Sequence, residues 1–195
     1  MGRIVVTENV TLDGVMQAPG RAGEDTRDGF RHGGWAGPYA DPVMMRVMGA
    51  GMAATGALLF GRRTYEDFFA VWHGRTDGNP FTAKLDATRK YVVSRTLAEP
   101  LSWPNSTLLA GEATAAVETL KKETDQDIAV LGSGELVRSL LARGLVDRLV
   151  LSVHPLVLGA GRRLFAADGP PAAFRLVESV PTGTGVVIAT YEVEK

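Results

Sequence analysis

The chain has 195 residues, of which 45% are hydrophobic and 22% charged, and its formal net charge is −1. These values predict one globular domain spanning residues 1–195. No basic block provides a field for nucleic acid or anionic lipid, and no apolar run is long enough to cross a bilayer. The absence of cysteine excludes disulfides, thiolate catalysis and cysteine-bound metals, so we expect a cytoplasmic protein.

The first quarter of the chain predicts a strand, a long loop and a helix. Residues 4–8 form a short run of mostly β-branched side chains, and a turn-rich segment follows at residues 11–14. Residues 18–37 are rich in Gly, Asp and Arg, and loops of that length often close over functional sites. Asp41 followed by Pro42 predicts the start of a methionine-rich helix that runs to about Ala54.

Strands and helices then alternate. The expected strands cover residues 57–60, 90–94, 107–109 and 128–131, and the expected helices cover residues 64–71, 113–123 and 135–143. This alternation predicts a mostly parallel sheet with helices on both faces. The last strands, residues 149–153, 174–180 and 186–193, have no helical pattern between them. A turn at residues 183–185 therefore predicts a C-terminal antiparallel hairpin.

Two arginines stand where one of these strands turns into a helix. An apolar strand leads through Gly61 to Arg62 and Arg63, and Thr64 is the expected helix cap. Free N–H groups at a helix N-terminus, together with guanidinium groups, suit a phosphate. The alternative is a capped helix with two solvated arginines, and this motif alone does not decide between them.

A second turn from strand to helix carries closely spaced glycines. Gly132, Ser133 and Gly134 lead into a helix that begins with Glu135 and Leu136. The glycines allow a pyrophosphate close to the backbone, and the serine offers a hydroxyl. Val137 stands where the dinucleotide fingerprint has its third glycine, so an ordinary tight turn is the alternative. Two such turns in one chain suit the separated phosphates of a dinucleotide.

A third polar cluster follows the strand at residues 90–94. Ser94, Arg95 and Thr96 combine two hydroxyls with a guanidinium group. Such a cluster suits the adenosine 2′-phosphate that distinguishes NADP from NAD. A polar loop after a strand is the alternative.

Together these segments resemble the dihydrofolate reductase superfamily, most closely its riboflavin-biosynthesis reductase branch, the C-terminal domain of the bifunctional deaminase-reductases. Residues 11–14 are similar to the Ser-Leu-Asp-Gly of that branch, and residues 61–66 to the Gly-Arg-x-Thr phosphate element of the superfamily. Residues 132–134 match its glycine pair, and residues 154–161 its Pro-x-x-x-Gly-x-Gly segment. The resemblance covers nearly the whole chain. It implies a three-layer α/β fold, NADPH as the cofactor and a homodimer that pairs through the apolar C-terminal strands.

The resemblance also implies a role for each site residue. The phosphates of NADPH would contact Gly61, Arg62, Arg63, Thr64, Ser94, Arg95, Gly132, Ser133, Gly134, Glu135 and Leu136. Thr11 and Met16 would line the nicotinamide end, where Asp13 is expected to supply the proton or to be a simple turn residue. Trp35 would close over the substrate from the loop, opposite Met45 and Met48. The three histidines lack metal-ligand spacing, so no metal is expected.

Two departures from the family affect the substrate. The helix at residues 42–54 has no acid, whereas folate reductases carry one there, and Val130-Leu131 stands where riboflavin reductases carry an acid. We therefore expect NADPH-dependent hydride transfer to a small heterocyclic substrate other than dihydrofolate. A non-catalytic protein that binds a nucleotide or small molecule on the same fold is the alternative.

Overall fold

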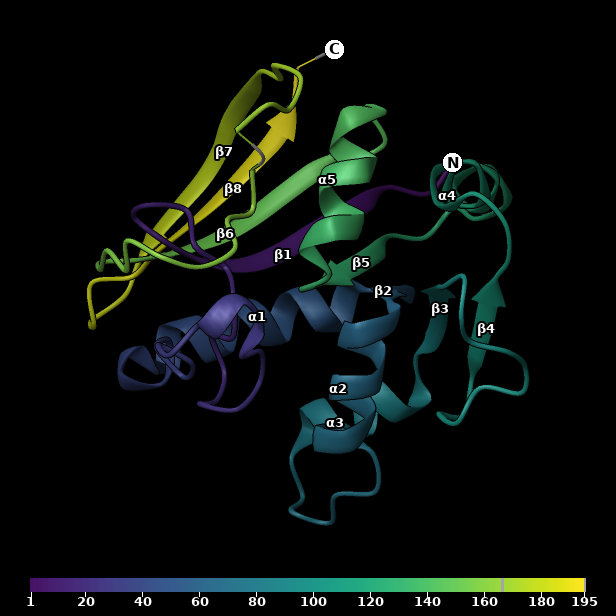
Figure 1. Ribbon diagram of the computed structural model, residues 1–195, viewed down its shortest axis with the longest axis horizontal. Helices are drawn as coiled ribbons and strands as arrows, with labels where there is room; N and C mark the ends of the chain where they lie inside the picture. The colour runs from purple at the N-terminus through teal and green to yellow at the C-terminus, as the bar shows by residue number, and fades with distance from the viewer. Residues whose placement is uncertain (166, 195) are drawn as a thin grey trace.

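A computed structural model describes residues 1–165 and 167–194, and these residues build one eight-stranded sheet between two layers of helices (Figure 1). The strands are β1 (Ile4–Thr11), β2 (Ala57–Gly61), β3 (Arg89–Val93), β4 (Ser106–Leu109), β5 (Ile128–Leu131), β6 (Arg148–His154), β7 (Phe174–Pro181) and β8 (Val187–Val193). The helices are α1 (Pro42–Ala54), α2 (Arg62–Trp72), α3 (Pro80–Ala87), α4 (Ala113–Glu123) and α5 (Gly134–Ala142). Two short 3-10 helices, Arg27–Gly29 and Gly37–Tyr39, lie in the loop before α1.

The strand order is β4-β3-β2-β5-β1-β6-β8-β7. The pairs from β4 to β6 are parallel, and β8 pairs antiparallel with both β6 and β7. The predicted α/β class and the antiparallel end of the sheet are thus confirmed. The sheet's edges, however, are β4 and β7. Residues 149–153 and 186–193, expected to form the open dimer edge, lie inside the sheet because β8 folds back between β6 and β7.

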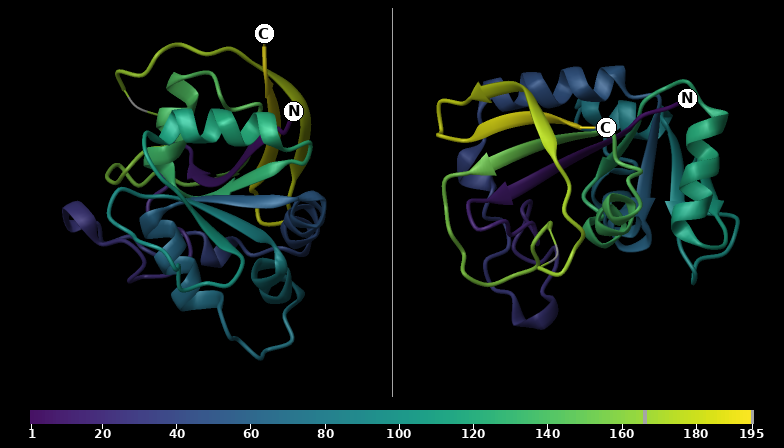
Figure 2. Two further views of the ribbon diagram at one scale, coloured as in Figure 1. Left: turned by 90° about the vertical axis from the view of Figure 1, so that its right-hand side faces the viewer. Right: turned by 90° about the horizontal axis from the view of Figure 1, so that it is seen from above.

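The two faces of the sheet are packed differently (Figure 2). On one face, α4 and α5 lie over β1, β5 and β6, and side chains such as Val6, Val137 and Leu140 are fully buried between them. On the other face, α2 and α3 cover β2 and β3 around Phe60 and Leu85. Helix α1 continues this second layer toward β6 and β8, but Met52 is its only buried residue.

Helix α3 was not expected from the sequence. Its start has the same signal as that of α1, because Asn79 precedes Pro80 and its side chain accepts a hydrogen bond from the Phe81 N–H. Gly74 and Gly78, which precede the helix, are typical of a loop and obscure this signal. Lys90 is fully buried and donates to three carbonyl groups near the C-terminal end of α3. It thereby satisfies acceptors that the helix itself leaves unpaired.

Several boundaries differ by two or three residues from those expected. β1 continues to Thr11 because its parallel pairing with β6 continues as far as His154. Helix α2 begins at Arg62 with Gly61 as its N-cap, so Thr64 is not the cap. Within the described part of the chain, no helix is long and apolar enough to cross a bilayer. Nor do His, Asp or Glu side chains gather there in a group that could hold a metal ion.

Candidate active site

A cavity of about 1200 Å³ opens at the carboxyl ends of the central strands and extends beneath α1. Its wall on the helix side includes Val47, Met48 and Met52, and its wall on the sheet side includes Thr7 and Asn9. Small-molecule sites usually enclose about 300–1,000 Å³. The volume is therefore sufficient for a large cofactor together with part of a substrate.

The two turns from strand to helix are locked together at the mouth of this cavity. The Gly61 N–H donates to Ser133 Oγ at 3.0 Å, and the Ser133 N–H donates to Thr64 Oγ1 at 3.1 Å. Gly132 and Ser133 both have left-handed φ angles, +60° and +64°, which are uncommon for serine and often found at functional sites. The exchange places the N-termini of α2 and α5 side by side. Thr64 and Ser133 thus hold the two turns together, a role the sequence did not predict.

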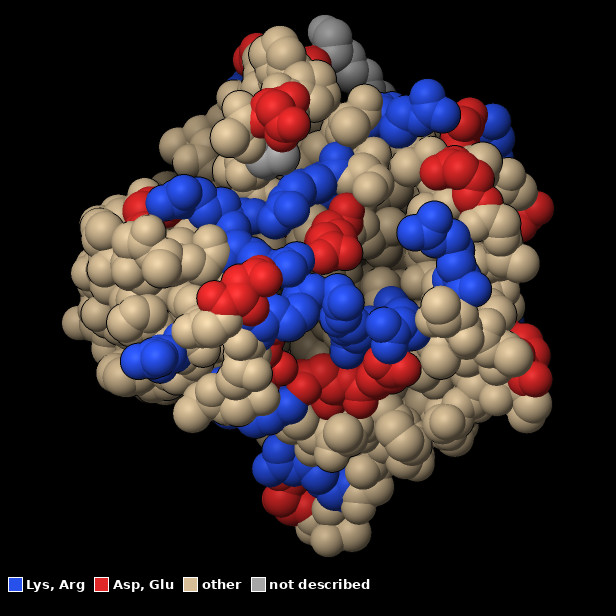
Figure 3. Space-filling model, viewed as in Figure 1, with Lys and Arg blue, Asp and Glu red and all other residues tan. Residues whose placement is uncertain are grey.

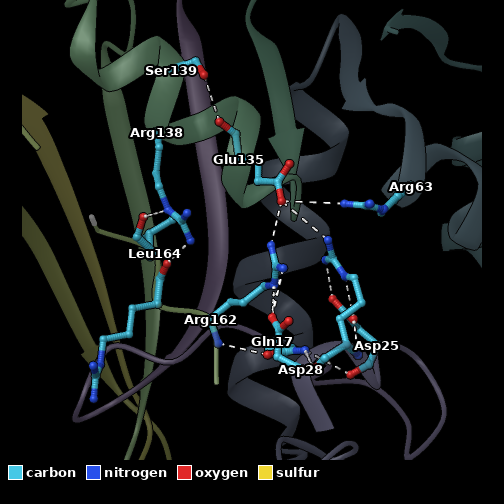
Figure 4. Close-up of polar contacts among 11 residues, drawn as sticks. Gln17, Asp25, Asp28, Arg63, Glu135, Arg138, Ser139, Arg162 and Leu164 are labelled. Carbon is cyan, nitrogen blue, oxygen red and sulfur yellow. Dashed lines mark hydrogen bonds and ion pairs between the residues drawn. The ribbon is translucent and has the colours of Figure 1, made fainter. Parts of the chain in front are cut away.

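Three guanidinium groups from separate segments converge on Glu135 at the start of α5 (Figure 4). The Nη1 atoms of Arg162, Arg27 and Arg63 lie 2.7, 3.5 and 3.6 Å from Glu135 Oε1. Basic side chains gather around a hollow in the middle of this face of the molecule (Figure 3). Arg27 also pairs with Asp25, and Arg162 with Asp28, so the three guanidinium groups face three carboxylates. The helix N-terminus adds N–H groups that favour a further anion, which would share these arginines with the carboxylates.

Arg27 and Arg162 were missed from the sequence. Arg27 lies in the long loop, and Arg162 follows the segment after β6, so neither has a local pattern that indicates a site. Gln17 joins the two segments, since its amide donates to the carbonyls of Asp25 and Arg27 and its Oε1 accepts from the Arg162 N–H. Folding therefore brings Arg27 to Glu135, 108 residues away in the sequence, and Gln17 to Arg162, 145 residues away.

Asp13 has surroundings that contradict its predicted role as a proton donor. Its carboxylate accepts hydrogen bonds from the Thr11 hydroxyl at 2.6 Å and from the N–H groups of Gly159 at 2.9 Å and Leu158 at 3.2 Å. The Thr11 hydrogen bond, followed by those two N–H groups, lowers the pKa of Asp13 to about 2. An ionised carboxylate has no proton to give. Asp13 and the buried Thr11 instead fasten the segment after β6 to the end of β1.

Trp35 does not close over the cavity as predicted. Its ring is buried, its Nε1 donates to the Gln17 carbonyl at 2.7 Å, and it meets the His154 ring edge to face at 5.0 Å. His154 is fully buried, and burial lowers its pKa to about 4. Its Nε2 lies 3.0 Å from Asn9 Oδ1. The long loop therefore packs on β6 through an aromatic cluster, in which the buried His154 gives Trp35 and Tyr39 an uncharged ring as partner.

The remaining predicted residues separate into two groups. Met16, Met48, Arg63, Thr64, Gly132, Ser133, Gly134 and Glu135 line the cavity. Met45 is 72% exposed on the outer side of α1, and Leu136 is buried in the core. Arg62 pairs with Glu66, and Ser94 Oγ accepts from the N–H groups of Thr96 and Leu97. Gly61 pairs with Val93 at the carboxyl ends of β2 and β3. Arg62 and Ser94, which come next in the chain, therefore follow neighbouring strand ends.

Glu8 is an acid of the site that was missed although the sequence contains a signal. It is 4% exposed and belongs to the cavity lining. Its Oε1 has no hydrogen-bond partner among the described residues. It stands in the inward register of β1 with Ile4, Val6 and Val10. An acid at an inward position of an apolar strand is unusual enough to mark a functional candidate.

Comparison with known proteins identifies the family. The model of the RibD C-terminal domain matches residues 3–188. The chain belongs to the RibD C-terminal domain family. The uncharacterized protein YyaP of Bacillus subtilis (strain 168) is 29% identical over 194 residues, which cover 97% of this chain and 94% of YyaP.

Solved structures agree on the fold of this RibD-type chain. A putative riboflavin biosynthesis protein from Shewanella sp. PV-4 superposes with a TM-score of 0.70 at 18% identity, over 99% of each chain. Dihydrofolate reductase from Enterococcus faecalis, solved in complex with NADP(H) and RAB-propyl, superposes with a TM-score of 0.63 at 13% identity, over 100% of this chain and 98% of that one. The fold is thus that of dihydrofolate reductase, as the sequence predicted.

Proposed function

We propose that this protein is a reductase that binds NADPH and transfers its hydride to a small, flat heterocyclic substrate. The observation that carries the proposal is the convergence of Arg27, Arg63 and Arg162 at the N-terminus of α5, beside the locked glycine turn. Hydride transfer needs a protein that aligns cofactor and substrate in a shielded site. A cavity that joins a phosphate-binding mouth to an apolar region under α1 meets that need.

We infer that NADPH is preferred over NADH. Arg62 is half-buried and Arg95 is exposed, and they follow the neighbouring ends of β2 and β3. The 2′-phosphate would lie there if the pyrophosphate occupies the turn at Gly132. A hydrogen bond to a charged group contributes about 1.5–3 kcal/mol. The dissociation constant of NADH should thus exceed that of NADPH by about tenfold or more.

Titration calorimetry with NADPH and NADH tests the binding part of the proposal. Arg162→Ala should weaken NADPH binding by about tenfold or more, because the pyrophosphate loses a charged contact. Arg175→Ala is the matched control, since Arg175 pairs with Glu192 on the C-terminal hairpin, away from the cavity. Equal dissociation constants for NADPH and NADH would contradict the preference for NADPH.

A substrate screen tests the catalytic part. We expect loss of NADPH absorbance with a flat nitrogen heterocycle and none with dihydrofolate, because α1 has no acid to pair with a pterin. A buried donor left unpaired costs about 1–3 kcal/mol. Retention of NADPH without oxidation across the screen would identify a binding protein on the same fold.

We propose that two copies associate through the β7 side of the sheet. Leu176 and Val177 on this edge strand are exposed, and an unpaired strand edge favours association. Light scattering at micromolar concentration should give twice the 20.8 kDa of one chain. The mass of a single chain would refute the dimer.

A further inference from the structure

One acid lies on the packed face of β1, in line with apolar neighbours. Glu8 shares this face with Val6 and Val10, and its Oε1 has no hydrogen-bond partner within the described residues. Burial, and next the charge of Glu24, raise the pKa of Glu8 well above its ordinary value. Burial therefore favours the neutral, protonated form of its carboxyl. Buried polar atoms without a partner are few in folded proteins, and those that exist call for an explanation.

Glu8 stands where β1 continues beyond the end of β5. The last parallel pair between the two strands joins Thr7 to Leu131, and the chain then turns away at Gly132 toward α5. Glu8 thus borders an opening between two strand ends. It lines the cavity together with Met16 and Gly134, whose contact is so close that a Cβ on Gly134 would overlap the Met16 sulfur. The unpartnered acid lies next to the turn that is suited to a pyrophosphate.

The chemistry of a protonated carboxyl selects its partner. The group offers one O–H donor and one carbonyl acceptor side by side. A primary carboxamide is complementary, because its N–H and its carbonyl lie on the same edge and form two hydrogen bonds with the acid. NADPH carries such a carboxamide on its nicotinamide ring, on the far side of the pyrophosphate from the adenosine.

We propose that Glu8 binds the nicotinamide carboxamide of NADPH through this pair of hydrogen bonds. The inference rests on the proposed function. Contact at two points fixes the rotation of the ring and hence the face that its hydride-bearing carbon presents to the substrate. Glu8 is then a residue that orients the cofactor, and its missing partner is supplied by the ligand.

Two variants and two ligands test this role. Glu8→Gln keeps a donor and an acceptor at the same place, whereas Glu8→Leu removes both and keeps a similar volume. The ligands are NADPH and its reduced 3-acetylpyridine analogue, in which a methyl ketone replaces the carboxamide. Dissociation constants come from titration calorimetry, and the midpoint of thermal unfolding is measured for each protein without ligand.

The wild type should bind NADPH about tenfold more tightly than the ketone analogue, because the ketone cannot donate to Glu8. Glu8→Gln should bind NADPH within about threefold of the wild type. Glu8→Leu should lose about tenfold in NADPH affinity and bind both ligands equally. Its unfolding midpoint should be equal to or above that of the wild type, because an apolar group replaces a buried polar group without a partner.

Equal binding of the two ligands by the wild type would overturn the role of Glu8, as would unchanged NADPH binding in Glu8→Leu. A Glu8→Leu protein that binds more weakly but still prefers the carboxamide would also overturn it, since packing would then explain the loss. If Glu8→Leu does not fold, two results still test the role of Glu8: the preference of the wild type for NADPH over the ketone analogue, and the NADPH affinity of Glu8→Gln. A wild type that binds neither NADPH nor NADH would overturn the proposed function itself, and this inference with it.

Discussion

The two faces of the central sheet differ in how their helices meet them. Under α4 and α5, inward residues of β1 such as Ile4 and Val6 are fully buried in a continuous apolar cluster. On the opposite face, Thr7 and Asn9 remain half-buried because α1 leaves the cavity between itself and the sheet. The same strand thus contributes to a packed core with alternate residues and to a ligand site with the others. Stability should depend mainly on the first face, and ligand binding on the second face together with Glu8, the acid that the first face carries toward the cavity.

The largest effect is expected on the packed face. Leu140→Ala removes a fully buried side chain of α5 and leaves a cavity that the surroundings fill only in part. It should lower the free energy of unfolding by about 2–5 kcal/mol. Urea denaturation measures this loss. A loss below about 1 kcal/mol would show that the face under α5 is as loosely packed as the one under α1.

A smaller effect is expected at Asp13, which fastens the segment after β6 to the end of β1. Asp13→Asn keeps the shape but weakens hydrogen bonds to a charged acceptor, so it should destabilise the fold by about 1–3 kcal/mol at neutral pH. The pKa of Asp13 is lowered from 3.8 to about 2, so this contribution is present above pH 3.8 and is lost as the pH falls through 2. The difference between wild type and variant should shrink over that interval.

Asp125→Asn is the control for this measurement. The Asp125 side chain is 97% exposed and pairs with the N-terminal amine, so its replacement should change stability by less than about 0.5 kcal/mol. Equal stabilities of the two variants would mean that the contacts of Asp13 are as weak as an ordinary surface ion pair.

His154, buried under the long loop, gives a pH test. Burial lowers its pKa from 6.5 to about 4, so the unfolded chain binds a proton before the folded one does. Stability should therefore fall as the pH decreases from 6.5 toward 4, by about 1.5 kcal/mol between pH 6.5 and 5. His154→Gln can still donate to Asn9 and does not titrate. Subtracting its unfolding curve from that of the wild type isolates this contribution, and a flat difference would show that His154 is not buried in solution.

Apart from the Asp125→Asn control, the smallest effect on stability is expected from Met48→Ala on α1. Met48 lines the cavity and is only partly buried, so its removal should cost less than about 1 kcal/mol. The same change should alter the Michaelis constant of whatever substrate the screen finds, since it enlarges the apolar wall. A loss comparable with that of Leu140→Ala would mean that α1 contributes to the core.

The sequence was informative where one local pattern determines the structure. Alternating strands and helices, the Asp41-Pro42 start of α1 and the two glycine turns are short-range signals, and all of them are present in the structure. The position of a loop, by contrast, is determined by contacts with residues that are distant in the sequence. Arg27 reaches α5 because Gln17 holds the carbonyl groups around it, and Trp35 turns inward because His154 offers it a neutral partner. Neither arrangement can be inferred from the residues around Arg27 or Trp35 alone.

The hydrogen bonds exchanged between the turns at Gly61 and Ser133 have a consequence for the entropy of binding. They fix the distance between the N-termini of α2 and α5 before any ligand arrives. Both turns are then already ordered in the free protein. A ligand that contacts both turns therefore pays a smaller entropy cost on binding, because it does not have to immobilise them. It must also match a preset spacing. A dinucleotide can meet that requirement, whereas a mononucleotide reaches one turn at a time and gains only part of the preorganisation.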